Sequence, residues 1–105
     1  MTLIKLNKLL KSLGIPVAYS HFNTPVKLPF ITYSEAGSSN FIADNKVFKK
    51  VIDVDIELYT NKKDLEIELL LEQLLSDNEI PYDTVENYID DEKVLQKIYE
   101  VRLIK

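Results

Sequence analysis

The segment VFKKVIDVDIELY, residues 47–59, decides the fold because apolar and acidic side chains alternate along most of its length. Successive side chains of an extended chain point to opposite sides, so this period of two predicts a β-strand with one face in the core. The apolar face carries Ile52, Val54, Ile56 and Leu58, and the opposite face carries the carboxylates of Asp53, Asp55 and Glu57.

A second strand is predicted just before this segment, over Pro29–Tyr33, where β-branched and aromatic residues are concentrated. Turn-forming residues then gather at Glu35–Asn40, and Phe41–Asn45 has no clear alternation. We therefore expect the two strands to be joined by a long β-hairpin loop.

Two helices are predicted from leucines at helical spacing. Thr2 can cap a helix that runs to about Leu13, and Asn61 can cap another that runs to about Ser76. The first helix is expected to bury Leu3, Leu6, Leu9, Leu10 and Leu13. The second is expected to bury Ile67, Leu70, Leu71 and Leu74, broadened by Leu65 and Leu75, and to point Glu66, Glu68 and Glu72 outward.

The remaining segments complete the predicted sheet. A short strand is expected over Val17–Phe22, and Tyr82–Tyr88 suggests irregular chain with a weak strand. Val94–Ile104 alternates and predicts a last strand, which the turn at residues 90–92 can join to the preceding segment as a hairpin. The expected fold is a single α+β domain over residues 1–105, with two helices packed on one face of an antiparallel sheet.

Composition limits the possible chemistry. A chain of 105 residues is too short for two cores, and its 46% hydrophobic content is too high for a disordered segment. The absence of cysteine excludes disulfides, thiolate nucleophiles and thiolate metal sites. A formal charge of −4 is the wrong sign for a protein that wraps nucleic acid, and no apolar run approaches the roughly 20 residues of a membrane span.

The candidate catalytic and metal-binding residues are few. His21 is the single histidine, and no serine has a nucleophile-elbow context, so a structural or solvated histidine is favoured over a catalytic one. The row Asp53, Asp55 and Glu57 could offer oxygen ligands to Mg²⁺ or Ca²⁺, but no loop supplies further ligands. A solvated sheet face, or a face that lines a subunit boundary or channel, is the alternative. No catalytic residue, metal ligand or cofactor is predicted.

Several segments together suggest a family. They are LPFITY at residues 28–33, FIADNK at 41–46, IELYTNKKD at 56–64, IPY at 80–82, YI at 88–89 and IYEV at 98–101. This pattern, from about Pro16 to the C-terminus, resembles the small tail-completion or tail-terminator proteins of tailed bacteriophages and prophages of Gram-positive bacteria.

The resemblance implies a non-enzymatic virion protein. Such proteins form a ring, usually a hexamer, at the head-proximal end of the tail tube, where the ring ends tube growth and joins the tail to the head connector. The implied partners are further copies of the chain, the major tail tube protein and the head connector or completion protein. DNA would pass through without specific binding, no membrane would be involved, and the protein would be assembled in the host cytoplasm into the head-proximal end of the virion tail.

The resemblance maps function to surfaces. Ser38, Ser39, Asn40, Phe41 and Ile42 are the expected subunit or partner interface, because two adjacent apolar side chains on an extended loop cannot both reach the core. Asp53, Asp55 and Glu57 are expected to line a lumen or a subunit boundary. The alternatives are a loop that folds back and buries both apolar residues, a head-completion protein, a small carboxylate-based metal-dependent hydrolase, and an adaptor that adds a strand to a partner's sheet.

Overall fold

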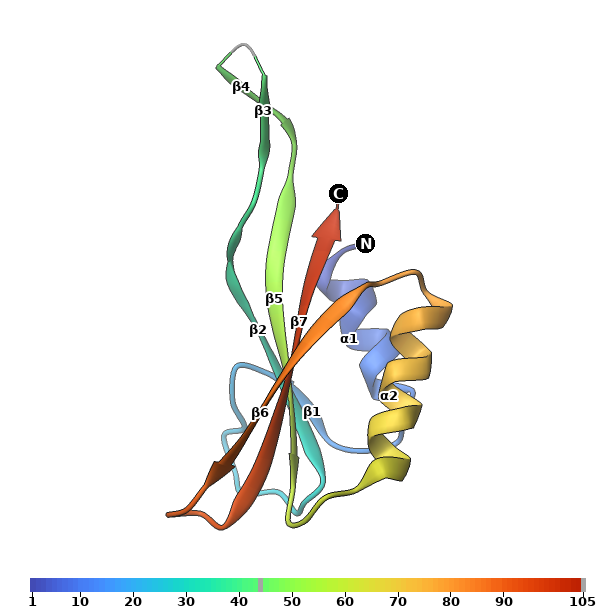
Figure 1. The fold of residues 1–105 in the computed structure, drawn as a ribbon, viewed down its shortest axis with the longest axis vertical. Helices are drawn as coiled ribbons and strands as arrows, with labels where there is room; N and C mark the ends of the chain where they lie inside the picture. Colours follow the sequence, from blue (N-terminus) through green and yellow to red (C-terminus); the bar gives the residue numbers. More distant parts are fainter. Residues whose placement is uncertain (44, 105) are drawn as a thin grey trace.

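A computed structural model describes residues 1–43 and 45–104 as an elongated α+β fold of 49 × 29 × 24 Å (Figure 1). Two helices and seven strands follow one another along these residues. They are α1 (Leu3–Lys11), β1 (Val17–Tyr19), β2 (Phe30–Ser38), β3 (Phe41–Ala43), β4 (Lys46–Lys49), β5 (Val51–Thr60), α2 (Leu65–Asp77), β6 (Tyr82–Ile89) and β7 (Val94–Ile104).

Strand β5 is the centre of a five-stranded sheet with the order β1-β2-β5-β7-β6. It pairs antiparallel with β2 on one side and with β7 on the other, where the register runs without interruption from Val51–Ile104 to Thr60–Leu95. The predicted alternation of this strand is confirmed, because Val54, Ile56 and Leu58 are fully buried.

The sheet is mixed, so the expectation of an antiparallel sheet was wrong. Strand β1 runs parallel to β2, with Val17 opposite Ile31 and Tyr19 opposite Tyr33. A tight hairpin would have made these neighbours antiparallel, but the ten residues of the segment Ser20–Pro29 carry the chain back to its starting end before β2 begins.

The helices begin at side-chain caps. Thr2 caps α1 as predicted, since its hydroxyl accepts the Lys5 amide at 3.1 Å. In α2 the cap is Asp64 rather than Asn61, because β5 extends to Thr60 and the chain needs residues 61–63 to leave the sheet. The Asp64 carboxylate accepts the Ile67 amide at 3.3 Å, a favourable charge at a helix N-terminus.

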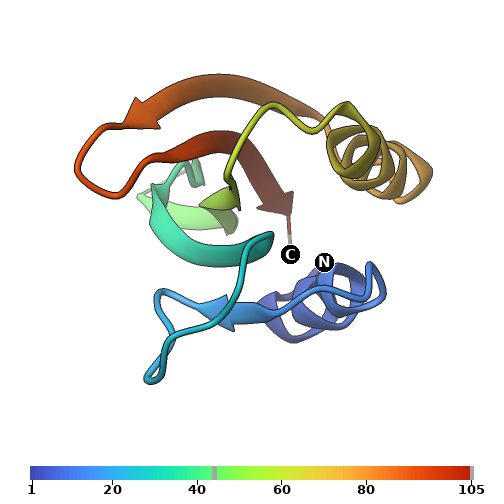
Figure 2. The ribbon, with the colours of Figure 1, turned by 90° about the horizontal axis from the view of Figure 1, so that it is seen from below.

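The hydrophobic core is one continuous cluster, formed by both helices and one face of the sheet. Both helices lie on the same side of the curved sheet (Figure 2). The helices contribute Leu6, Leu10, Ile67, Leu71 and Leu75, and the sheet contributes Ile31, Tyr33, Val54, Ile56, Leu58, Tyr99, Val101 and Leu103.

Helix α2 is rotated relative to the prediction. Leu65 and Leu70, which were expected in the core, are 63% and 51% exposed, and Leu69 is also exposed. Glu68, which was expected to point outward, is 3% exposed. Two lysines explain the difference, because Lys97 of β7 and Lys63, which precedes α2, hold the Glu68 carboxylate inside, as described below.

The β2–β5 hairpin is much more regular than predicted. The turn expected at Glu35–Asn40 was wrong, since β2 continues to Ser38 through a β-bulge between Glu35 and Gly37. Beyond it, β3 and β4 pair as a separate two-stranded ribbon. We call residues 39–43 and 45–50 the arm, which projects beyond the rest of the sheet (Figure 1).

Strand β6 is the second element that is more regular than predicted from the sequence. Instead of irregular chain, Tyr82–Ile89 pairs with β7 along its whole length, from Tyr82–Val101 to Ile89–Val94. The predicted hairpin between these segments is confirmed, and β7 has the predicted bounds Val94–Ile104.

We predict that Leu71→Ala lowers the free energy of unfolding by about 2–5 kcal/mol, because the Leu71 side chain of α2 is fully buried in the core. Its neighbour Leu70 is the matched control. Leu70→Ala should change stability by no more than about 0.5 kcal/mol, since that side chain is half exposed. Chemical denaturation measures both values, and equal effects would contradict the rotation of α2.

Candidate functional surfaces

Four of the five residues predicted as an interface lie in the arm, and Ser38 directly precedes it. Ser38 ends β2, Ser39 and Asn40 follow it, and Phe41 and Ile42 belong to β3 rather than to an irregular loop. The Ile42 side chain is 70% exposed, whereas the placement of the Phe41 side chain lies outside what the structure describes.

Hydrogen bonds fix the base of the arm. The Ser39 hydroxyl donates to Asp53 at 2.7 Å, and the Ser39 amide donates to the Val51 carbonyl at 3.0 Å. The Asn40 side-chain oxygen accepts the Val51 amide at 3.0 Å, which replaces a bond that the sheet no longer provides there. The polar residues that suggested a flexible turn therefore continue the pairing between the two strands.

The carboxylates of Asp53, Asp55 and Glu57 stand on the face of the sheet opposite to the core. Glu57 accepts hydrogen bonds from the hydroxyls of Tyr59 at 2.7 Å and Thr32 at 3.2 Å. Arg102 Nε lies 3.3 Å from Asp53 Oδ1, but the 70% exposure of the arginine makes this a weak ion pair. Neither helix covers this face (Figure 2).

Like charges lie directly opposite one another on this same face. Asp55 pairs in register with Glu100 of β7, and Glu100 pairs with Asp83 of β6. Burial, together with the charges of Glu57 and Asp53, raises the pKa of Asp55. Opposed carboxylates destabilise a sheet, so this row has a cost within the isolated chain.

A groove of about 630 Å³ runs along the row and is lined in part by Asp53, Asp55, Asp83, Glu100 and Arg102. In the described parts of the chain, no group of three or more His, Asp or Glu side chains is placed to hold a metal ion. The described residues of this face therefore form a negatively charged groove, but no metal-coordination site.

His21 lies on the loop between β1 and β2, beside a second groove of about 700 Å³ that also includes Phe22, Phe30 and Tyr59. Its Nδ1 is 3.1 Å from the hydroxyl of the preceding Ser20. Both side chains are exposed, and among the described residues no carboxylate is hydrogen-bonded to the imidazole. A serine beside its own neighbouring histidine, without an orienting acid, lacks the geometry of a catalytic triad.

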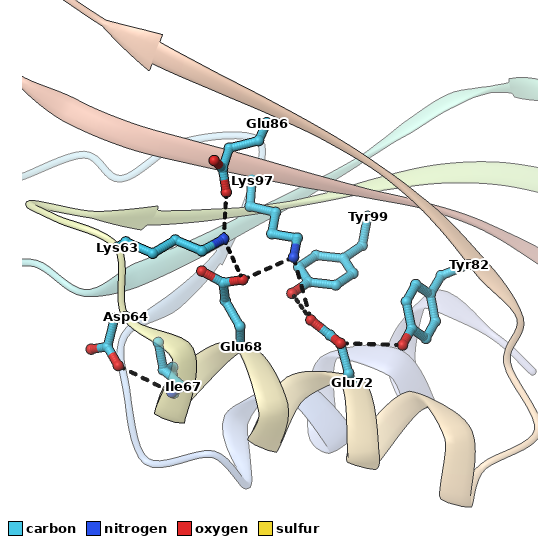
Figure 3. A network of polar contacts seen from close by, with 9 residues as sticks. All are labelled: Lys63, Asp64, Ile67, Glu68, Glu72, Tyr82, Glu86, Lys97 and Tyr99. Carbon is cyan, nitrogen blue, oxygen red and sulfur yellow. Dashed lines mark hydrogen bonds and ion pairs between the residues drawn. The ribbon is translucent and has the colours of Figure 1, made fainter.

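Sequence reasoning missed a polar network between α2 and the sheet (Figure 3). Glu68 accepts hydrogen bonds from Lys97 of β7 at 2.8 Å and from Lys63 at 2.9 Å, and Lys63 also contacts Glu86 at 2.7 Å. One turn further along α2, Glu72 accepts the hydroxyl of Tyr99 at 2.8 Å. The residue in the sequence that could have revealed this network is Lys97, a cation on the core side of β7.

The network changes the proton affinity of its members. Burial alone would raise the pKa of Glu68, but the hydrogen bonds from Lys97 and Lys63 outweigh it, so this pKa lies below its usual range. Burial and the hydrogen bond to Glu72 raise the pKa of Tyr99. The carboxylate of Glu68 is thus kept ionised inside the protein, as a link between α2 and β7.

The rotation of α2 leaves an apolar strip outside, which sequence reasoning also missed. Leu65, Leu69 and Leu70 are each at least 51% exposed. Exposed apolar side chains that are neighbours on one helix are a common feature of interaction surfaces.

Comparison with known proteins leaves the family open. Neither a scan against protein-family models nor a search of curated proteins gives a match to this chain. Within the described residues, neither helix is long and apolar enough to cross a membrane.

We predict that Glu68→Ala lowers the free energy of unfolding by about 3–5 kcal/mol, because it leaves Lys97 inside the protein without its nearest counter-charge. Glu66→Ala is the matched control on the exposed side of the same helix and should have little effect. Urea denaturation at neutral pH measures both variants.

The pH dependence provides an independent check of the Glu68 interaction. A carboxyl group whose pKa is lowered by folding stabilises the protein above its unfolded pKa, near 4.3. This stability is lost as the pH falls through the lower pKa of the folded state. In the Glu68→Gln variant, the free energy of unfolding should therefore fall less steeply below about pH 4.3 than in the unaltered chain. The same pH dependence in both proteins would contradict an ionised Glu68 in the native state.

Proposed function

We propose that the chain is a structural subunit of a phage tail, which forms a ring at the head-proximal end of the tail tube, terminates tube growth and joins the tail to the head connector. The observation that carries the proposal is the arm. It extends past the rest of the sheet and presents Ile42 with 70% of its side chain exposed. An apolar side chain at the end of a paired ribbon is well placed for burial against a second molecule.

Two further features support an assembly role. The α2 strip of Leu65, Leu69 and Leu70 gives the body a second apolar surface, distinct from the arm. The opposite face of the sheet is acidic, which suits either place expected for it, a boundary with a neighbouring subunit or the wall of a lumen that DNA must cross without being held. The resemblance of residues 16–105 to tail-terminator proteins supplies the specific place in the virion.

A head-completion protein of the same virion is the nearest alternative. It would also need an arm and exposed apolar surfaces, but its loss would leave tails of normal length without heads. A tail terminator acts on the tube itself, so its loss should give tails of uncontrolled length. Tail length therefore separates the two functions.

We predict that Phe41→Ser combined with Ile42→Ser leaves the chain folded but prevents its assembly. Phage particles built with this variant should show overlong tails in electron micrographs. Ile4→Ser is the matched control, because Ile4 is equally exposed but lies on α1, away from the arm. It should leave tail length normal.

Three outcomes would contradict the proposal or part of it. Normal tails with the double variant would exclude the arm as the assembly element. Normal-length tails without heads would favour the head-completion protein. A melting temperature lowered by more than about 4–8 °C, equivalent to roughly 1 kcal/mol in a domain of this size, would place these residues in the folded core.

A further inference from the structure

Charge is divided unevenly over the molecule. Residues 41–50 contain three lysines and one acidic residue, although the whole chain has a formal charge of −4. The side chains of Lys46 and Lys50 are exposed on the arm. The groove on the helix-free face of the sheet has the opposite character, with four carboxylates and one arginine among its lining residues.

We propose that the arm of one copy docks, through Lys46 and Lys50, in the groove lined by Asp55, Asp83 and Glu100 of the next copy. This inference rests on the proposed function and deepens it, because it names the surface that receives the arm. Because the arm and the groove are different surfaces, each copy can give its arm to one neighbour and receive the arm of another, so the contact can repeat head-to-tail around a ring.

The arm cannot reach the groove of its own chain. Ala36 and Asp53, which line the groove, lie on β2 and β5 just below the base of the arm. The pairing of Ser38 with Ile52 and the bonds of Ser39 and Asn40 to Val51 direct the arm away from the body. Folding back would break these bonds, so the groove is open to the arm of a second copy.

Repulsion among the carboxylates of the groove gives the docking a driving force. Asp55, Glu100 and Asp83 face one another across three neighbouring strands without a lysine between them. Lysines from a neighbouring arm would offset this repulsion, and the exposed Ile42 would leave solvent in the same step. Charge complementarity also fixes orientation, because arm against arm and groove against groove would repel.

Paired charge reversals test the contact. The first variant combines Lys46→Glu with Lys50→Glu, and the second combines Asp83→Lys with Glu100→Lys. Sedimentation velocity at low salt should show that each variant alone associates at least about tenfold more weakly than the unaltered chain. An equal mixture should recover association to within about threefold, because each acidic arm then meets a basic groove and each basic arm an acidic one.

Matched controls separate this contact from net charge and from unfolding. Asp90→Lys with Asp91→Lys changes the net charge as much as the groove variant, but at the exposed β6–β7 turn, and should leave association unchanged. All altered side chains are exposed, so thermal unfolding of each variant should remain cooperative. Asp83→Lys with Glu100→Lys should be at least as stable as the unaltered chain, because the new positive charge at position 100 lies opposite Asp55, while positions 83 and 100 carry like charges both before and after the change.

Each contrary result overturns this inference without removing the proposed function. A chain that stays monomeric at several hundred micromolar (a level at which even weak interfaces associate) would contradict arm-to-groove docking, while a ring could still form on the tail tube alone. Association that survives reversal of the arm charges, or that is weakened equally by the turn control, would also contradict it. So would a result in which the unaltered chain binds duplex DNA and the arm variant loses that binding but associates normally. Normal tail length in the Phe41 and Ile42 double variant, in contrast, bears on the proposed function itself.

Discussion

The alternation of β5 is the constraint on which the rest of the structure depends. Its apolar side chains meet both helices in the core, while Asp53, Asp55 and Glu57 stand on the opposite face. A shift of one residue in register would exchange these faces and place three carboxylates in the core, so the pairing with β2 and β7 has only one acceptable register. The same strand leads directly out of the arm. The alternation that builds the core therefore also sets the direction of the arm and the charge of the outer face.

The ionised Glu68 is the second organising feature. Hydrogen bonds from Lys97 and Lys63 hold its carboxylate between α2 and β7 and select which side of the helix faces the sheet. Replacing such a pair with apolar residues is often neutral for stability, so the network is best understood as a device for orientation. Its consequence is the exposure of Leu65, Leu69 and Leu70. The polar contacts inside thus create an apolar surface outside.

Sequence reasoning succeeded where one physical signal dominated. The alternation in β5 and β7, the Thr2 cap and the helical spacing of Leu6 and Leu10 each had a single structural reading. It failed on α2 because leucines occur on both sides of that helix, so periodicity could not choose the buried face. The choice came from Lys97, which lies 29 residues beyond Glu68 along the chain.

The same limit applies to the sheet and the candidate surfaces. Gly37, Ser39 and Asn40 have turn propensity, but β5 supplies backbone partners that keep them extended. The parallel course of β1 depends on where the segment Ser20–Pro29 returns, which local sequence does not encode. Only part of the carboxylate row could be predicted from the sequence. Asp53, Asp55 and Glu57 could be placed on one face, whereas Asp83 and Glu100 joined them only through strand register.

Site-specific cross-linking tests the arm-to-groove contact most directly, because the chain has no native cysteine to confuse the result. A variant with Lys46→Cys and Asp83→Cys, oxidised under conditions that permit association, should form disulfides between copies. Denaturing gels should show a ladder that ends at one closed-ring size, whereas Lys46→Cys with Asp91→Cys should remain monomeric. A Lys46–Asp83 variant that stays monomeric while the unaltered chain forms rings would contradict the account.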